Sequence, residues 1–159
     1  MPLKDLLSRE RIAVLDQPLD SAAVLDAAAR LLSLDKPGDA APIAACLLQR
    51  ERLGSTAIGH GVAIPHGRLP GLEASRGAFL RLAQPVEFDA ADGQRVDLVM
   101  ALAVPEHYVQ QHLAQLAEIA EHFASAAFRD ELRRATSASQ LSGLLLAGSS
   151  RKNVAGAVR

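Results

Sequence analysis

The chain has 159 residues, of which 49% are hydrophobic and 22% charged, and this size and balance predict a single globular domain with one sizeable core. The formal net charge of −1 at pH 7 provides no overall attraction to a polyanion, so neither nucleic acid nor an anionic membrane surface is expected as a partner. The single cysteine, Cys46, excludes an internal disulfide, and no apolar run is long enough for a secretory signal or a membrane span, so we expect a cytoplasmic protein without membrane insertion.

The N-terminal third predicts one strand and two helices. Arg11–Leu15 has the apolar and β-branched character of a short strand. A helix capped by Asp20 or Ser21 is expected to follow and to end near residue 35, because its apolar residues recur at helical spacing. Proline and glycine then break the chain, and a second amphipathic helix is expected over residues 39–53.

The middle of the chain changes to the composition of strands. Four short runs are expected to be strands: residues 62–64, 78–82, 86–88 and 96–104. The last run is nearly all apolar, which favours a place at the centre of the sheet with both faces covered. Asp92-Gly93 has the composition of a tight turn and predicts a hairpin between the last two strands.

Helical spacing returns in the C-terminal third. Helices are expected over residues 109–124 and 127–134, and Ser137 with Gln140 forms a capping-box pattern that opens a last helix. The expected fold class is therefore α/β (α+β): one domain over residues 1–148, with a mixed, largely central β-sheet sandwiched by helices on both faces. The small polar residues 149–159 are expected to form a disordered tail.

Residues 53–68 combine glycines, hydroxyls and imidazoles around one short strand. Pro65 extends the residue before it and removes a backbone donor, which predicts that His66 lies where the strand leaves the sheet. Gly67 would let another backbone or an oxyanion approach without a Cβ in the way. An imidazole held there is a good nucleophile toward phosphorus, because one nitrogen attacks while the other keeps its proton. We therefore predict that His66 accepts a phosphoryl group; a structural histidine at a strand end is the alternative.

A second histidine, His112, has the phase of an inward-facing residue. It lies four and seven residues before Leu116 and Ile119, within the first turn of the predicted helix. Beside a phosphorylated His66 it could donate to phosphate oxygens, at a helix N-terminus that carries partial positive charge. A core-edge histidine bonded to a backbone carbonyl is the alternative.

Arg50 lies near the apolar face of its predicted helix, one turn before Ser55 and Thr56. Its guanidinium could bind a phosphoryl group bidentately, or pair with a structural carboxylate such as Glu51 or Asp97. The two hydroxyls could bond the phosphate or a neighbouring imidazole, or belong to an ordinary turn. The sequence leaves these alternatives open.

The sequence has no pattern typical of a metal or cofactor site. His107 and His112 would lie about 140° apart around a helix, and paired cysteines and the His-Glu-x-x-His pattern are missing. No Walker loop, dinucleotide fingerprint or Gly-x-Ser-x-Gly elbow occurs. We expect no metal and no cofactor.

Six segments of the chain together form a pattern that is specific as a set: Arg50-Glu51, residues 53–59, residues 61–67 with the motif Ile-Pro-His-Gly, residues 96–98, residues 101–105 and His112-Leu113. Together they resemble the mannitol/fructose-type enzyme IIA domain of the bacterial phosphotransferase system (PTS EIIA type-2), from about Leu6 to Leu146. Within that family the chain is most similar to the nitrogen-regulatory branch, because its short length leads us to expect a stand-alone domain without a fused permease or enzyme IIB.

The resemblance implies roles for named residues and partners. His66 would be the phosphorylated residue, His112 the second active-centre histidine and Arg50 a phosphate contact. The donor would be a histidine-containing phosphocarrier protein, and the regulated partners proteins such as potassium transporters or sensor kinases. Where the family commonly has asparagine between two glycines, this chain has His60. His60 could tune the pKa of His66 or bind an anion, but we favour a turn, because histidine, like asparagine, tolerates strained backbone angles.

Two other functions are compatible with the sequence. The chain could be a sugar-specific (fructose/mannitol-type) enzyme IIA that passes phosphate to a separate enzyme IIB. It could also be a non-catalytic protein-interaction module whose histidines are structural. For phosphoryl transfer between proteins, we expect His66 in an open depression with an apolar rim on which a partner docks.

Overall fold

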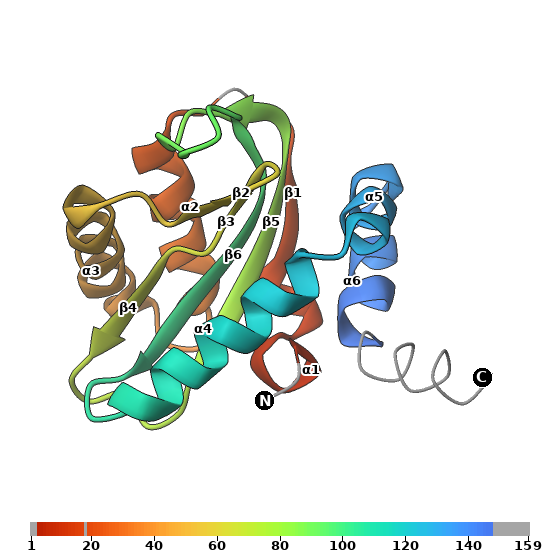
Figure 1. The fold of residues 1–159 in the computed structure, drawn as a ribbon. Helices are drawn as coiled ribbons and strands as arrows, with labels where there is room; N and C mark the ends of the chain where they lie inside the picture. The colour runs from red at the N-terminus through yellow and green to blue at the C-terminus, as the bar shows by residue number, and fades with distance from the viewer. Residues whose placement is uncertain (1–2, 18, 148–159) are drawn as a thin grey trace.

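The computed structural model describes residues 3–17 and 19–147. The predicted tail over residues 149–159, and residue 148 at the expected end of the domain, lie outside the described residues. Within the described part, helices lie on both sides of a six-stranded mixed sheet (Figure 1), as the sequence predicted.

The helices come from both ends of the chain and the strands mainly from its middle. The α-helices are α1 (Leu3–Leu6), α2 (Ser21–Leu32), α3 (Ala40–Leu53), α4 (Val109–Phe123), α5 (Ala126–Arg134) and α6 (Ala138–Leu146), and short 3-10 turns occur at Arg9–Arg11 and Pro37–Asp39. The strands are β1 (Ile12–Leu15), β2 (Ala57–Gly59), β3 (Val62–Ala63), β4 (His66–Leu69), β5 (Arg76–Val86) and β6 (Val96–Pro105). The spatial order is β1-β5-β6-β3-β2, and β4 also pairs with β6.

β6 is the central strand, as its apolar run predicted. All of its residues are buried except Asp97, which is half-buried. It pairs antiparallel with β5 and parallel with both β3 and β4. The predicted hairpin across Asp92-Gly93 is present, since Val86 pairs with Val96.

The sheet differs from the prediction at β2 and β4, which were not expected, and at the end of β5. Residues 78–82 and 86–88 were expected to be two strands, but β5 is a single strand that ends at Val86. Its register is irregular between Arg81 and Val86, and this irregularity accommodates Pro85, which cannot donate to a regular ladder. Phe88 lies beyond the strand with a buried side chain.

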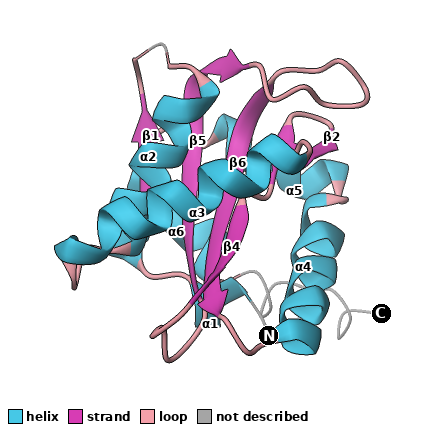
Figure 2. Cartoon of the chain, turned by 90° about the vertical axis from the view of Figure 1, so that its left-hand side faces the viewer, coloured by secondary structure: helices cyan, strands magenta, loops and turns pink. Residues whose placement is uncertain are grey.

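The two faces of the sheet carry two apolar layers. α2 and α3 pack on one face, where Leu80 and Val99 point, and α1, α4, α5 and α6 contribute to the layer on the other, where Phe79 and Met100 point. Figure 2 views the molecule from the side of α3, with α4 to the right of the strands. The rings of Phe79 and Phe123 stack in the second layer, with centroids 6.0 Å apart.

The helix boundaries follow local hydrogen bonds. The Asp20 side chain accepts from the Ala23 amide at 2.8 Å, which confirms Asp20 as the cap of α2. α2 ends at Leu32, earlier than the expected end near residue 35. At this end the Ser33 hydroxyl donates to the Ala29 carbonyl at 2.8 Å. Among the described residues, no helix combines the length and the apolar character that a bilayer crossing would require.

Candidate functional site

The site is built on β3 and β4, which both pair parallel with β6 and are separated by Ile64 and Pro65. β3 pairs with the first half of β6, and β4 pairs with the second half, with His66 opposite Leu102. Between them, the Pro65 carbonyl accepts from the Leu102 amide at 2.9 Å. The expectation that His66 marks the exit from the sheet is therefore wrong: His66 opens β4, because the missing donor of Pro65 falls at an interruption where no ladder bond is needed.

The His66 ring has a defined tautomer. Its Nδ1 lies 2.8 Å from the Ile64 carbonyl oxygen, and because a carbonyl can only accept, Nδ1 carries the proton. The lone pair is then on Nε2. Burial lowers the pKa of His66 below 6.5, and the nearby Arg50 charge lowers it further, while the bond to Ile64 acts in the opposite direction. His66 is thus a neutral imidazole at pH 7 with Nε2 available as a nucleophile.

α4 brings His112 against His66. The ring centroids lie 5.0 Å apart with the ring planes 54° apart. His112 is buried, and its Nδ1 has no hydrogen-bond partner among the described residues. Burial lowers the pKa of His112 to about 4, and the charges of His66 and Arg68 contribute in the same direction. A second neutral imidazole with an unsatisfied nitrogen therefore faces the first.

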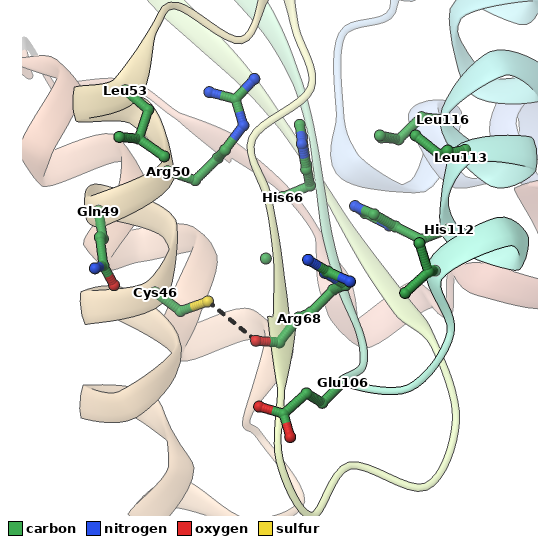
Figure 3. Close-up of a pocket in the computed structure, with 12 residues that line it drawn as sticks. Cys46, Gln49, Arg50, Leu53, His66, Arg68, Glu106, His112, Leu113 and Leu116 are labelled. Atoms are coloured by element: carbon green, nitrogen blue, oxygen red, sulfur yellow. Dashed lines mark hydrogen bonds between the residues drawn. The ribbon is translucent and has the colours of Figure 1, made fainter.

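The two histidines share an open depression of about 510 Å³ between α3 and α4, above β4 (Figure 3). It is lined by Cys46, Gln49, Arg50, Leu53, His66, Gly67, Arg68, Glu106, Val109, His112, Leu113 and Leu116. Leu53, Val109 and Leu113 are large apolar side chains that are 82%, 51% and 62% exposed. They form the apolar rim that the sequence analysis expected.

Arg50 reaches this depression from the last turn of α3, and its side chain lies on the His66 side in Figure 3. Its Nη1 donates to the Gly54 carbonyl at 2.7 Å. Neither structural carboxylate that was considered binds it: Glu51 accepts from a residue of the following loop, and Asp97 pairs with an arginine of α5. Its charge therefore faces the imidazole pair.

Ser55 and Thr56 lie outside the depression. The Ser55 hydroxyl donates to the Phe88 carbonyl, and the Thr56 hydroxyl donates to the Glu51 carboxylate at 2.5 Å. The Thr56 amide also donates to Glu51, at 2.9 Å. Both hydroxyls thus connect the loop to α3 and to the segment after β5, and their proposed contact with phosphate stays a prediction.

His60 also lies outside the depression. It is exposed, has φ 58°, and sits between Gly59 and Gly61, which also have positive φ, at the turn between β2 and β3. Its amide donates to Asp92 at 2.9 Å, and its carbonyl accepts from Arg133 at 2.6 Å. This geometry matches the turn interpretation.

Gly67 fits one of the two reasons expected for it, the close approach of another backbone. A Cβ on Gly67 would lie 2.4 Å from the Cys46 sulfur of α3, so the missing side chain lets α3 pack against β4. Gly67 also lines the depression, and the approach of an oxyanion to it stays a prediction. Gly67→Ala is expected to lower the free energy of unfolding by about 1–3 kcal/mol through overpacking, as measured by urea denaturation. The double variant Gly67→Ala/Cys46→Ala should regain part of that loss. If Gly67→Ala lowered the free energy of unfolding equally with Cys46 present and in the Cys46→Ala background, the contact with the Cys46 sulfur would not be the cause.

Arg68 is a charged residue of this depression that the sequence pattern did not indicate. It follows His66 by two positions on β4, so the two side chains point to the same face of the strand. Period-two spacing would have identified it, but only if residues 66–69 had been recognised as a strand.

Residues 5–147 match the family model described as phosphoenolpyruvate-dependent sugar phosphotransferase system, EIIA 2. The chain belongs to this EIIA 2 family. The nitrogen regulatory protein of Bradyrhizobium diazoefficiens is 40% identical to this EIIA chain over 146 residues, which cover 91% of the chain and 95% of the relative. The nitrogen regulatory protein of Pseudomonas aeruginosa is 45% identical over 119 residues, which cover 74% and 77%.

Solved structures agree with the fold of this EIIA chain. The nitrogen regulatory protein IIA-Ntr of Neisseria meningitidis superposes with a TM-score of 0.81 at 38% identity, over 90% of this chain and 98% of that one. IIA mannitol of Escherichia coli superposes with a TM-score of 0.71 over 87% and 98%, and at 19% identity it shares the fold alone. The resemblance stated from the sequence is thereby confirmed at the level of the family.

Proposed function

We propose that this EIIA domain is a phosphohistidine carrier of a nitrogen-regulatory phosphotransferase system in the cytoplasm. His66 accepts a phosphoryl group from a histidine-containing phosphocarrier protein, and the phosphorylation state then regulates partner proteins, for which potassium transporters and sensor kinases are the candidates. The observation that carries the proposal is the neutral His66 ring, which lines an open depression and is held at Nδ1 by the Ile64 carbonyl, so that the lone pair is on Nε2.

The transfer exchanges one P–N bond for another. The Nε2 lone pair of His66 forms a bond to phosphorus as the P–N bond of the donor breaks, and that electron pair returns to the donor nitrogen. Positive charge develops on the His66 ring, where the Nδ1 proton remains on its bond to Ile64. That bond therefore orients the nucleophile and stabilises the charge that the ring acquires.

Groups around His66 suit the negative charge of the phosphoryl group. His112 is a neutral imidazole with one N–H, which could donate a hydrogen bond to an oxygen of a phosphoryl group on the adjacent His66 ring. The first turn of α4 adds the partial positive charge of a helix N-terminus. Arg50 contributes a full positive charge from α3.

The rim supports a protein as donor. Leu53, Val109 and Leu113 provide exposed apolar surface directly around the imidazole pair. A fold neighbour, enzyme IIA mannitol of Escherichia coli, was solved in complex with phosphorylated enzyme IIB mannitol, so that protein meets its phosphorylated partner directly. Nitrogen regulatory proteins and a homolog are 34–45% identical to this chain, whereas two sugar-specific EIIABC components are 29% and 31% identical, and this difference favours the regulatory role over the sugar-specific one.

The test is incubation of the purified chain with a phosphorylated histidine phosphocarrier. One acid-labile phosphate is expected per chain, and NMR of the imidazole nitrogens should place it on Nε2 of His66. Phosphate on Nδ1, on another residue, or on none would contradict the proposal. Adding an enzyme IIB to the phosphorylated chain separates the sugar-specific alternative, because only a sugar-pathway protein would pass its phosphate on.

A further inference from the structure

Arg68 is a cation in the depression without a structural role for its guanidinium. It is exposed, and Figure 3 shows its side chain directed from β4 toward His112, below His66. The Arg68 carbonyl accepts from Cys46, but among residues 3–17 and 19–147 the guanidinium makes no hydrogen bond and no ion pair. Glu106 also lines the depression without pairing with it.

Arg68 and Arg50 act on different members of the imidazole pair. The Arg50 charge lowers the pKa of His66, whereas the Arg68 charge lowers the pKa of His112. Arg50 comes from α3 and Arg68 from β4, so two positive charges approach the histidines from different elements. Both favour neutral rings, and both would be stabilised by an anion bound between them.

The two arginines differ in how many donors they have available. Arg50 has one nitrogen bound to the Gly54 carbonyl, whereas all the donors of Arg68 are free within the described residues. Arg68 also shares the strand face of His66, two residues away, which corresponds to about 7 Å along the strand. A guanidinium on that face can reach a group attached to the His66 ring.

We propose that Arg68 is a phosphate-binding residue, whose guanidinium holds the oxygens of the phosphoryl group on Nε2 of His66. Planar guanidinium donors match two phosphate oxygens at once, so Arg68 fixes the group in line for transfer as well as offsetting its charge. This inference rests on the proposed function of His66, and it adds β4 to α3 and α4 as an element that supplies groups for the phosphate.

The test compares Arg68→Gln with wild type in the phosphocarrier assay. Loss of a charge-assisted hydrogen bond should slow phosphoryl acceptance by roughly ten- to one-hundredfold, with most of the effect on kcat and little on the KM for the phosphocarrier. Arg68→Lys keeps the charge without the fork and should be intermediate. Arg52→Gln, an exposed arginine of α3 outside the depression, makes the same change in net charge and should stay within about twofold.

A second readout reports on the phosphate itself. In a ³¹P NMR titration of the phosphorylated chain, Arg68→Gln should raise the pKa of the phosphoryl group by roughly one pH unit, because a neighbouring cation is lost. Wild-type kcat with an unchanged phosphate pKa would overturn the inference, and so would an effect on KM alone, which would assign Arg68 to docking. In both cases wild type still carries phosphate on His66, whereas a wild-type chain that takes none would refute the proposed function and, with it, this role of Arg68.

Discussion

His66→Gln is expected to lose phosphoryl acceptance completely, to the background of an intact-mass assay. An amide nitrogen has no available lone pair for a bond to phosphorus, whereas Nε2 of a neutral imidazole does. Within residues 3–17 and 19–147 the half-buried ring makes one hydrogen bond, to Ile64, so the variant should remain folded. Its circular dichroism and unfolding midpoint therefore need to be measured beside the phosphorylation assay.

His107→Gln is the matched control for this experiment. His107 is exposed in the turn before α4, packs against Tyr108 and does not line the depression, so this variant should accept phosphate as wild type does. His112→Gln keeps the nucleophile but loses the neighbouring imidazole, and it should be slowed and not silent. Acceptance by His66→Gln at the wild-type rate would show that another residue carries the phosphate.

His112 is expected to make the stability of the fold depend on pH. Its pKa is about 4 in the folded protein, compared with an ordinary value of 6.5. Between these values the unfolded chain binds the proton and the folded chain does not, so the free energy of unfolding falls as the pH falls from 6.5 toward 4. The gap corresponds to roughly 3 kcal/mol, and the lowered pKa of His66 adds a loss of the same sign.

Urea denaturation of wild type and His112→Gln between pH 7.5 and 4.5 isolates this contribution from that of the carboxylates. The difference in unfolding free energy between the two proteins should shift in favour of His112→Gln as the pH is lowered, by most of the roughly 3 kcal/mol. His107→Gln removes an exposed histidine and should follow wild type. Parallel curves for wild type and His112→Gln would mean that His112 titrates near its ordinary pKa.

The elements with strong periodicity could be predicted from sequence. The apolar run of β6 indicated a strand covered on both faces, and the α4 stripe through Ile119 and Phe123 indicated a helix packed on the sheet. That same helical phase predicted an inward His112. These signals are local, because each is repeated within one element.

The elements that the sequence did not predict form through contacts with residues distant in the chain. Residues 66–69 are His-Gly-Arg-Leu, which have little strand character, and β4 is extended because it pairs with residues 102–105 of β6. α1 is too short to show a helical period, although Leu3 and Leu6 are fully buried. Arg68 was missed together with its strand.

Side-chain partners in the loops were the least predictable part of the site. The hydroxyl of Thr56 could have faced a phosphate or an imidazole, but the Glu51 carboxylate, five residues earlier, accepts both its hydroxyl and its amide. Gly67 likewise could have admitted another backbone or an oxyanion, and it is α3, with the Cys46 sulfur, that lies against it. Such choices depend on which neighbour the fold brings nearest.

The attachment of His66 to the central strand limits how a partner could recognise the proposed phosphorylation of its ring. The backbone on either side of the ring pairs with β6, which is buried through most of its length, and the Pro65 carbonyl adds one more bond to that strand. A phosphate would therefore alter the field around the depression and leave the shape of the sheet as it is. At physiological ionic strength that field decays over about 8 Å, so a regulated partner would have to bring its own charged groups within that range, and its discrimination would weaken with added salt.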